Sequence, residues 1–217
     1  MIVLIITAVR VKSMDSHRIS GRILAENIAG PGMMRLVEQS MQAQAQKTSV
    51  TEIAVKERKH PQAALTFDDG PDIRYTPLLL DCLKERNVRV SFFLLGEKVE
   101  QYPELVERMQ KEGHLVGNHT YHHVQLNKLN ETKAREEILK TNNLIYETTG
   151  VYPLYLRPPF GAWKKNLELC VEMLPVFWTI DTLDWKVQNT EKIVRTVQEQ
   201  IEDGAIILMH DEYDTSV

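Results

Sequence analysis

The sequence predicts an α/β fold built on a parallel sheet. From Gln62 onward, short apolar stretches alternate with amphipathic ones, which is the order that repeated strand–helix units produce. Most of the apolar stretches stop at an acidic, basic or histidine residue. The carboxyl ends of parallel strands meet at one rim of a closed sheet, whereas an open doubly wound sheet binds ligands only near its switch point. The placement of the polar residues therefore favours a (β/α) barrel with one functional site at that rim.

Length and composition allow one domain with a sizeable core. The chain has 217 residues, of which 43% are hydrophobic, and this is too few for two full domains. The formal net charge of -4 is spread without long runs of one sign, so nucleic acid is not indicated, and no protein partner is implied. Cys82 and Cys170 are far apart and lack metal-ligand spacing, which indicates buried or idle thiols.

The N-terminal region, 1–60, differs from the rest. It opens with an apolar run at 1–9, which is too short to span a bilayer. This run is either a buried strand or the remnant of a membrane anchor or signal sequence. The polar, Ala/Gln-rich stretch at 39–46 suits an exposed helix or a linker. We therefore expect an anchor remnant, stalk or linker at 1–60 and one folded domain at 61–217.

The first strand of the expected sheet is 63–67, an apolar run that ends in the stretch A-L-T-F-D-D-G-P. Gly70 and Pro71 then turn the chain. Thr76 is a suitable N-cap ahead of Pro77, so we expect a helix to begin there.

Helix and strand signals then alternate to the end of the chain. Proline at a first helical position and glycine after a last one mark the helix ends. In order, we expect a strand at 88–95, a helix at 103–113, a short strand at 115–116, a helix at 131–149 closed by Gly150, an extended piece at 152–156, a helix at 163–174, a strand at 176–180, a helix at 190–203 and a strand at 205–209.

Asp68 and Asp69 are adjacent carboxylates at the end of the first expected strand. Such a pair repels unless a cation, an arginine or a shared proton relieves the charge. This requirement directs attention to histidines and arginines at the other strand ends.

His119 and His123 stand four apart in H-T-Y-H-H. This offset puts two imidazoles on one side of a helical turn, as in zinc-chelating helices, although histidine pairs also occur on ordinary surfaces. Two histidines and one aspartate would leave a fourth metal position open for water, which is the catalytic arrangement of zinc. The second aspartate would then be free to act as a base.

Arg157 and His210 follow two further expected strands. Arg157, in R-P-P-F-G, is either the positive neighbour that one aspartate needs or a surface ion pair on a proline-rich turn. The backbone N–H groups near Phe160 are candidates for stabilising an oxyanion. His210 is either a packed core histidine or a general acid whose pKa is raised by a carboxylate from D-T-L-D-W, 181–185.

Five stretches in this order resemble the motifs of the polysaccharide deacetylase family, also called the NodB-homology or carbohydrate esterase family 4 domain. They are T-F-D-D-G-P, H-T-Y-H-H, R-P-P-F-G, D-T-L-D-W and L-M-H, and together they span about two thirds of the chain. The resemblance implies a distorted (β/α) barrel and metal-dependent removal of acetyl groups from N-acetylated sugars such as peptidoglycan or chitin.

The resemblance also implies a role for each matching residue. Asp68 corresponds to the catalytic base and Arg157 to the arginine that orients it. Asp69, His119 and His123 correspond to the metal ligands. His210 corresponds to the general acid and Asp184 to the carboxylate that tunes it. The residues that correspond to substrate-binding positions around the acetyl group are Phe160, Trp185 and Leu208.

One departure from the family concerns the C-terminal end. The family usually continues past the last motif with a helix and a strand, whereas seven residues follow His210 here. We therefore expect a C-terminally short barrel that lacks its last helix and strand.

The function expected from the sequence is hydrolysis of N-acetyl groups on a polysaccharide that contains N-acetylglucosamine, outside the cell or at its surface. Zn²⁺ is the expected metal, with Co²⁺, Ni²⁺ or Fe²⁺ also compatible with two imidazoles and a carboxylate. The alternatives are an esterase or amidase acting on another acetylated substrate, such as xylan, and an inactive module that binds the cell wall.

Overall fold

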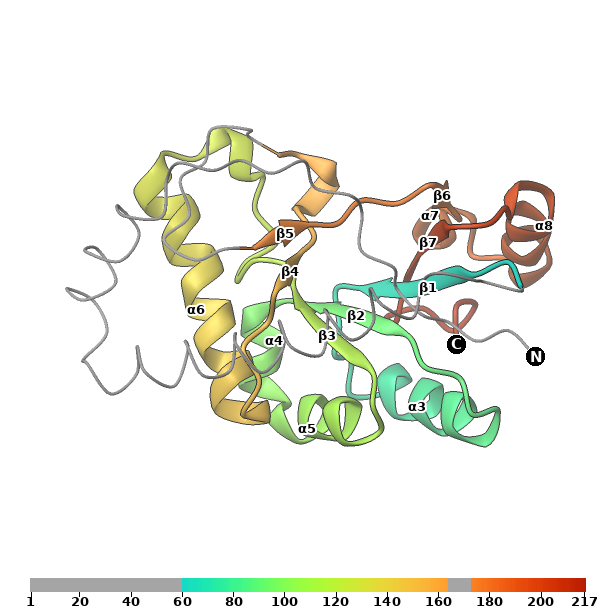
Figure 1. Ribbon diagram of the computed structural model, residues 1–217, viewed down its shortest axis with the longest axis horizontal. Helices are drawn as coiled ribbons and strands as arrows, with labels where there is room; N and C mark the ends of the chain where they lie inside the picture. Colours follow the sequence, from blue (N-terminus) through green and yellow to red (C-terminus); the bar gives the residue numbers. More distant parts are fainter. Residues whose placement is uncertain (1–59, 164–172) are drawn as a thin grey trace.

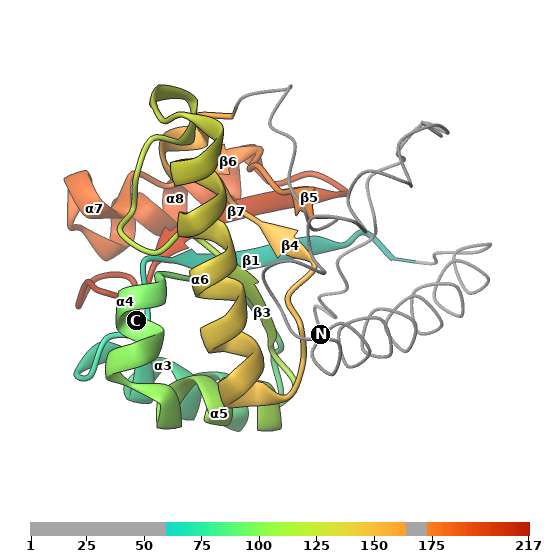
Figure 2. The same ribbon diagram turned by 90° about the vertical axis from the view of Figure 1, so that its left-hand side faces the viewer.

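The computed structural model describes residues 60–163 and 173–217. Within these residues, all strands belong to one parallel sheet with the order β5-β4-β3-β2-β1-β7-β6. The strands are β1 (Ala63–Asp68), β2 (Ser91–Leu94), β3 (Leu115–Asn118), β4 (Tyr155–Leu156), β5 (Leu174–Pro175), β6 (Ile180–Asp181) and β7 (Ala205–His210). The sheet curls into an open half-barrel, as Figures 1 and 2 show from two sides. The expected α/β fold with a distorted barrel is confirmed.

Helices cover the outside of the curled sheet. They are α3 (Tyr75–Glu85), α4 (Gly96–Gln101), α5 (Pro103–Lys111), α6 (Glu131–Thr149), α7 (Asp184–Val187) and α8 (Thr190–Gln200), with 3₁₀ turns η2 (Leu126–Lys128) and η3 (Pro159–Gly161). In both views α3 and α5 lie below the sheet, whereas α7 and α8 lie beside its β6–β7 end. No helix of the described residues has the length and apolar character needed to cross a membrane.

The residues at the helix ends explain why the longer helices begin and end where they do. Asn130 caps α6 by accepting a hydrogen bond from the Lys133 N–H at 2.9 Å, and Gly150 ends this helix in the left-handed conformation. Pro103 occupies the first turn of α5, where its missing N–H costs nothing.

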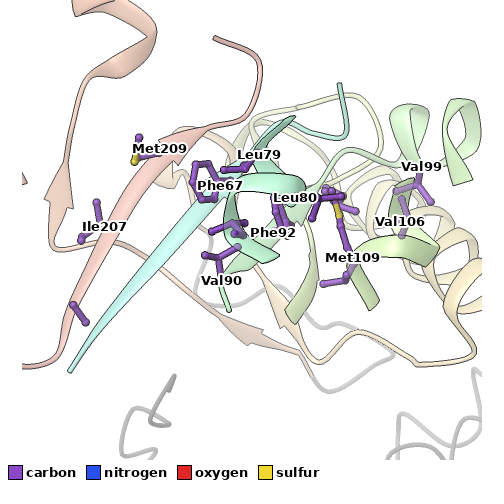
Figure 3. Close-up of a cluster of buried hydrophobic side chains, with 14 of the residues drawn as sticks. Phe67, Leu79, Leu80, Val90, Phe92, Val99, Val106, Met109, Ile207 and Met209 are labelled. Carbon is purple, nitrogen blue, oxygen red and sulfur yellow. The ribbon is translucent and has the colours of Figure 1, made fainter. Parts of the chain in front are cut away.

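The core lies between the sheet and its helices. Phe67 of β1, Phe92 of β2 and Met209 of β7 belong to one buried cluster with Leu80 of α3 and Met109 of α5, whose side chains Figure 3 draws. Side chains alternate between the two faces of a strand, so the intervening residues of the same strands point into the half-barrel. Thr66, Asp68 and His210 are therefore on the inner face, and this alternation delivers the polar residues to the rim.

Several elements differ from the sequence-based expectation. The second strand is shorter, and α4 follows it directly at Gly96. Helix α3 begins at Tyr75, one residue before Thr76, and its N-cap is Arg74. Asp72 Oδ1 accepts the N–H groups of Arg74 and Tyr75 at 2.8 and 2.9 Å. At 176–180, only Ile180 belongs to a strand, although the N–H groups of Val176 and Thr179 donate to the carbonyls of Leu156 in β4 and Ile206 in β7.

Two expectations lie largely outside the described residues. These are the anchor, stalk or linker at 1–60 and most of the helix at 163–174.

Gly117 tests how closely the inner face of the half-barrel is packed. A Cβ at this position would lie 2.7 Å from the Phe93 ring and 3.1 Å from the Tyr155 carbonyl oxygen. We expect Gly117→Ala to lower the free energy of unfolding by about 1–3 kcal/mol in urea titrations.

Gly150→Asn is the matched control. Gly150 has φ 72° and no heavy atom within 4 Å of a built Cβ, and asparagine tolerates this conformation, so the cost should be about 0.5 kcal/mol or less. Equal stability of Gly117→Ala and the parent would contradict the close approach.

Candidate active site and metal centre

The end of β1 places two carboxylates at the rim of the half-barrel. Asp68 is buried as the last residue of the strand, and Asp69 follows it with φ 71°. In a continued strand the two side chains would point to opposite faces. The left-handed conformation of Asp69 instead keeps both carboxylates near one imidazole. His119 Nε2 lies 3.7 Å from Asp68 Oδ2 and 3.4 Å from Asp69 Oδ1.

Asp68 forms a buried ion pair with Arg157. Arg157 Nη1 donates to Asp68 Oδ1 at 2.7 Å, and neither side chain is more than 4% exposed. The same nitrogen donates to Thr66 Oγ1 at 2.7 Å, and the guanidinium carbon lies 4.2 Å from the centre of the Phe93 ring. These contacts hold the guanidinium in one place, so the charge of Asp68 is compensated without a cation from outside.

Asp69, His119 and His123 bring three ligand atoms together. The atoms lie within 4.8 Å of one another, and Asp69 Oδ1 is 3.4 Å from Nε2 of each histidine. Two ligand atoms of a tetrahedral ion with bonds of about 2 Å are about 3.3 Å apart. Asp69 Oδ1 is also buried without a hydrogen-bond partner among the described residues. The three residues therefore fit a divalent metal ion.

The orientation of His119 suits a metal ligand. Its Nδ1 lies 2.6 Å from the carbonyl oxygen of Arg157. Because a carbonyl can only accept, Nδ1 carries the proton in the neutral ring and Nε2 turns its lone pair toward Asp69. Arg157 thus binds Asp68 through its side chain and orients His119 through its backbone carbonyl.

The loop that carries the two histidines is not the expected helical turn. It is irregular from His119 onward, and Thr120 and His123 have φ values of 67° and 55°. The imidazoles converge because of these left-handed residues, with ring centres 5.0 Å apart. The four-residue offset therefore predicted the correct pair of histidines, but the helical turn from which it was predicted is absent from this loop.

The electrostatics of this cluster favour a positive charge at its centre. Burial raises the pKa of Asp69, but His119 and His123 lower it more, so it lies well below its ordinary range. Burial lowers the pKa of His119, but Asp68 and Asp69 raise it more. The pKa of His123 is lowered, mainly by burial. With two carboxylates nearby, the cluster stabilises either a proton or a cation.

A second histidine–carboxylate pair faces the cluster from β7. His210 Nδ1 lies 2.8 Å from Asp184 Oδ1, and the His210 N–H donates to Asp184 Oδ2 at 2.7 Å. Ser216 Oγ also donates to Asp184, at 2.6 Å. Burial lowers the pKa of His210, but Asp184 raises it more through its hydrogen bond and charge. His210 Nε2 is 3.9 Å from Asp69 Oδ2, so the imidazole can hold and release a proton at the site.

The three expected substrate-binding residues lie in different surroundings. Phe160 is 62% exposed, and its ring centre is 4.6 Å from that of His123. Trp185 is half exposed on α7, directly after Asp184. Leu208 is buried on β7, two residues before His210 and on the same face. No contact among the described residues tests their roles in substrate binding.

The sequence analysis missed Asp211, the residue after His210. It is fully buried, its Oδ2 accepts a hydrogen bond from Thr76 Oγ1, and its Oδ1 has no partner among the described residues. Burial raises the pKa of Asp211 to about 7. A Cβ on Gly70 would lie 2.3 Å from Asp211 Oδ1, so the turn after Asp69 rests directly on this carboxyl. The sequence signal that could have indicated such a close contact is Gly70 in D-D-G-P, because a residue with a Cβ does not fit there.

A family model described as polysaccharide deacetylase matches residues 55–176, more than half of the chain. The chain belongs to the polysaccharide deacetylase family. The resemblance inferred from the five motifs is thereby confirmed.

This chain is similar to members of the polysaccharide deacetylase family in both sequence and structure. A peptidoglycan-N-acetylglucosamine deacetylase of Bacillus cereus is 43% identical over 152 residues, which cover 69% of this chain and 55% of the relative. A chitooligosaccharide deacetylase of Bradyrhizobium is 36% identical over 153 residues, covering 69% and 70%. The structure of peptidoglycan deacetylase PdaC from Bacillus subtilis superposes with a TM-score of 0.70 at 40% identity, covering 73% and 78%. The chain spans about half the length of the Bacillus cereus protein.

Asp184→Asn tests whether this carboxylate sets the protonation of His210. Because Asp184 raises the pKa of His210 against the effect of burial, its neutralisation should lower that pKa, so that the imidazole loses its proton at lower pH than in the parent. An NMR titration of the histidine ring protons measures this directly.

Asp181→Asn is the control for this titration. Asp181 lies on the preceding strand and accepts the N–H of Leu183 at 2.9 Å, so its variant should leave the pKa of His210 at the parent value. An unchanged His210 titration in Asp184→Asn would rule out the proposed tuning.

Proposed function

We propose that the protein is a metal-dependent N-deacetylase that acts on polysaccharide containing N-acetylglucosamine, of the peptidoglycan or chitin type. The observation that carries this proposal is the convergence of three groups at one rim. A candidate metal triad lies between a carboxylate paired with arginine and a histidine paired with aspartate. The names of the Bacillus cereus and Bradyrhizobium relatives support the same chemistry.

Asp69, His119 and His123 would hold the metal. A divalent cation at this place polarises a carbonyl oxygen and makes water more acidic. Zn²⁺ suits two imidazoles and one carboxylate best, and Co²⁺, Ni²⁺ and Fe²⁺ are the alternatives that the same ligands accept.

Asp68 acts as the base in this mechanism. Its carboxylate accepts a proton from the water that attacks the acetyl carbonyl, which forms the new carbon–oxygen bond. The ion pair with Arg157 holds the carboxylate in position. Arg157 is itself buried and hydrogen-bonded to Thr66. Its guanidinium is therefore fixed and keeps the Asp68 carboxylate at the site.

The turn after Arg157 is assigned to the oxyanion, and His210 at the end of β7 is assigned to the leaving amine. In the turn after Arg157, the N–H groups of Gly161 and Ala162 donate to the carbonyls of Pro158 and Pro159, so the Phe160 N–H is the amide of this turn assigned to the oxyanion. His210 donates its proton to the departing amine as the carbon–nitrogen bond breaks, and the products are acetate and a free amino sugar.

The sugar and its acetyl group would lie against apolar surface around the rim. We assign the acetyl methyl to Leu208 and Trp185 and a face of the sugar ring to the exposed Phe160. Aromatic and aliphatic side chains of this kind line most small-ligand sites, with a few polar groups fixing orientation.

The proposed place of action is outside the cell or at its surface. Peptidoglycan and chitin are extracellular polymers, so an enzyme that deacetylates them must reach them there. Residues 1–60 would serve as a membrane anchor, stalk or linker that holds the catalytic domain, 61–217, near its substrate.

Acetate release tests the proposal and its substrate class. Purified protein is loaded with Zn²⁺ and given peptidoglycan, chitooligosaccharides or acetylated xylan, with and without a chelator. We expect chelator-sensitive release from the first two. Release from xylan alone would make the protein an esterase, and no release from any substrate would make it a binding module.

Substitution of the adjacent aspartates should separate the base from the metal ligand. Asp68→Asn should keep its metal but lose roughly 10²–10⁴-fold in turnover. Asp69→Asn should lose metal affinity, because it replaces the negatively charged carboxylate that faces both histidines by a neutral amide. Metal content by elemental analysis and acetate release are measured on the same samples. Parent-level turnover in Asp68→Asn would show that the base is another group.

A further inference from the structure

The loop between β3 and η2 needs external support to hold its two histidines. Thr120 and His123 adopt the left-handed conformation, which costs roughly 1–2 kcal/mol for a residue with a Cβ. In isolation the loop would relax toward more favourable backbone angles, and the imidazoles would separate.

Glu137 of α6 binds the middle of this loop. Its Oε2 accepts the N–H groups of Tyr121 and His122 at 3.0 and 2.9 Å, and its Oε1 lies 2.8 Å from His122 Nδ1. The Glu137 side chain is only 16% exposed. Hydrogen bonds from N–H groups to a carboxylate are about twice as strong as those between neutral groups.

The start of the loop is tied to the same helix. Asn118 Oδ1 accepts the Thr120 N–H at 2.6 Å. Asn118 Nδ2 donates to Asn142 Oδ1 at 2.7 Å and to the Ile138 carbonyl at 2.9 Å. Helix α6 therefore holds the loop at two places: at Asn118, at the end of β3, and, through Glu137, at Tyr121 and His122.

The loop carbonyls have partners on another helix. The N–H groups of Gly96 and Glu97, at the beginning of α4, donate to the carbonyls of Thr120 and Tyr121 at 2.9 and 3.3 Å. Glu137 is thus the group that satisfies the N–H side of the same peptides. Without it, two adjacent N–H groups lose an ionised acceptor, and the left-handed conformations lose part of what stabilises them.

We propose that Glu137 is a positioning residue of the metal site, which sets metal affinity by fixing the loop between His119 and His123. It touches neither the metal ligands nor the substrate directly, and it acts through the backbone of Tyr121 and His122. The inference rests on the metal site of the proposed function and concerns a residue outside the five motifs.

Metal affinity without any sugar is the deciding measurement. Zn²⁺ is titrated into metal-free parent and variants in competition with a chromophoric chelator, and the melting temperature of each metal-free protein is recorded. Glu137→Ala should weaken binding by about 10-fold or more, as loss of a partner around metal ligands does. Glu137→Asp should weaken it too, because the shortened carboxylate cannot reach both N–H groups.

Two further variants separate positioning from charge and from general helix effects. Glu137→Gln can keep an oxygen on both N–H groups while its amide donates to His122 Nδ1, so it should restore most of the affinity. Glu136→Ala makes the same truncation at an exposed neighbour on α6 and should stay within about two-fold of the parent.

The outcomes distinguish this inference from the proposed function. If Glu137→Ala and Glu137→Asp fold and bind Zn²⁺ as tightly as the parent, Glu137 has no positioning role. If Glu137→Ala does not fold, Glu137→Asp and Glu137→Gln still decide the question. If the parent binds no Zn²⁺, the metal site itself is wrong, and both proposals fall. Metal binding without acetate release would overturn the deacetylase alone.

Discussion

The site depends on how two adjacent carboxylates at the end of β1 are neutralised. Asp68 and Asp69 lie next to each other in a largely buried place, where like charges are costly. Asp69 has a left-handed backbone, and the two carboxylates have different partners. Asp68 is compensated by the buried guanidinium of Arg157, whereas Asp69 faces the imidazoles of His119 and His123. The cation that neutralises Asp68 is thus a residue of the chain itself, Arg157. Asp69 instead presents to a metal an oxygen that has no hydrogen-bond partner among the described residues.

The half-barrel makes this arrangement possible because parallel strands end at one rim. Asp68 pairs in register with His210 across β1 and β7, and Asn118 at the end of β3 pairs with Leu156, directly before Arg157. Residues far apart in sequence are therefore neighbours through sheet hydrogen bonds alone. The alternation of side chains along β1 and β7 then puts Phe67 and Met209 toward the helices and Thr66, Asp68 and His210 toward the inside of the half-barrel.

Strand ends were predictable from the sequence, whereas the conformations of the loops beyond them were not. Apolar runs that stop at Asp68 or His210 carry a clear signal, since burial and the alternation of residues along a strand are properties of the strand itself. The histidine loop carries no such signal, because left-handed residues are usually glycine or asparagine and here one is Thr120. Asp211 and Glu137 were missed for a related reason. Their importance arises from contacts with residues far away in the sequence, which no local pattern records.

A crystal structure of the metal-loaded protein, with the metal located by anomalous scattering, tests the division between the two carboxylates most directly. The account predicts one metal bonded to Asp69 and to Nε2 of both His119 and His123, with the Asp68 carboxylate still hydrogen-bonded to Arg157. A metal bonded to Asp68, or an Arg157 guanidinium that has left Asp68 when the metal is present, would contradict it.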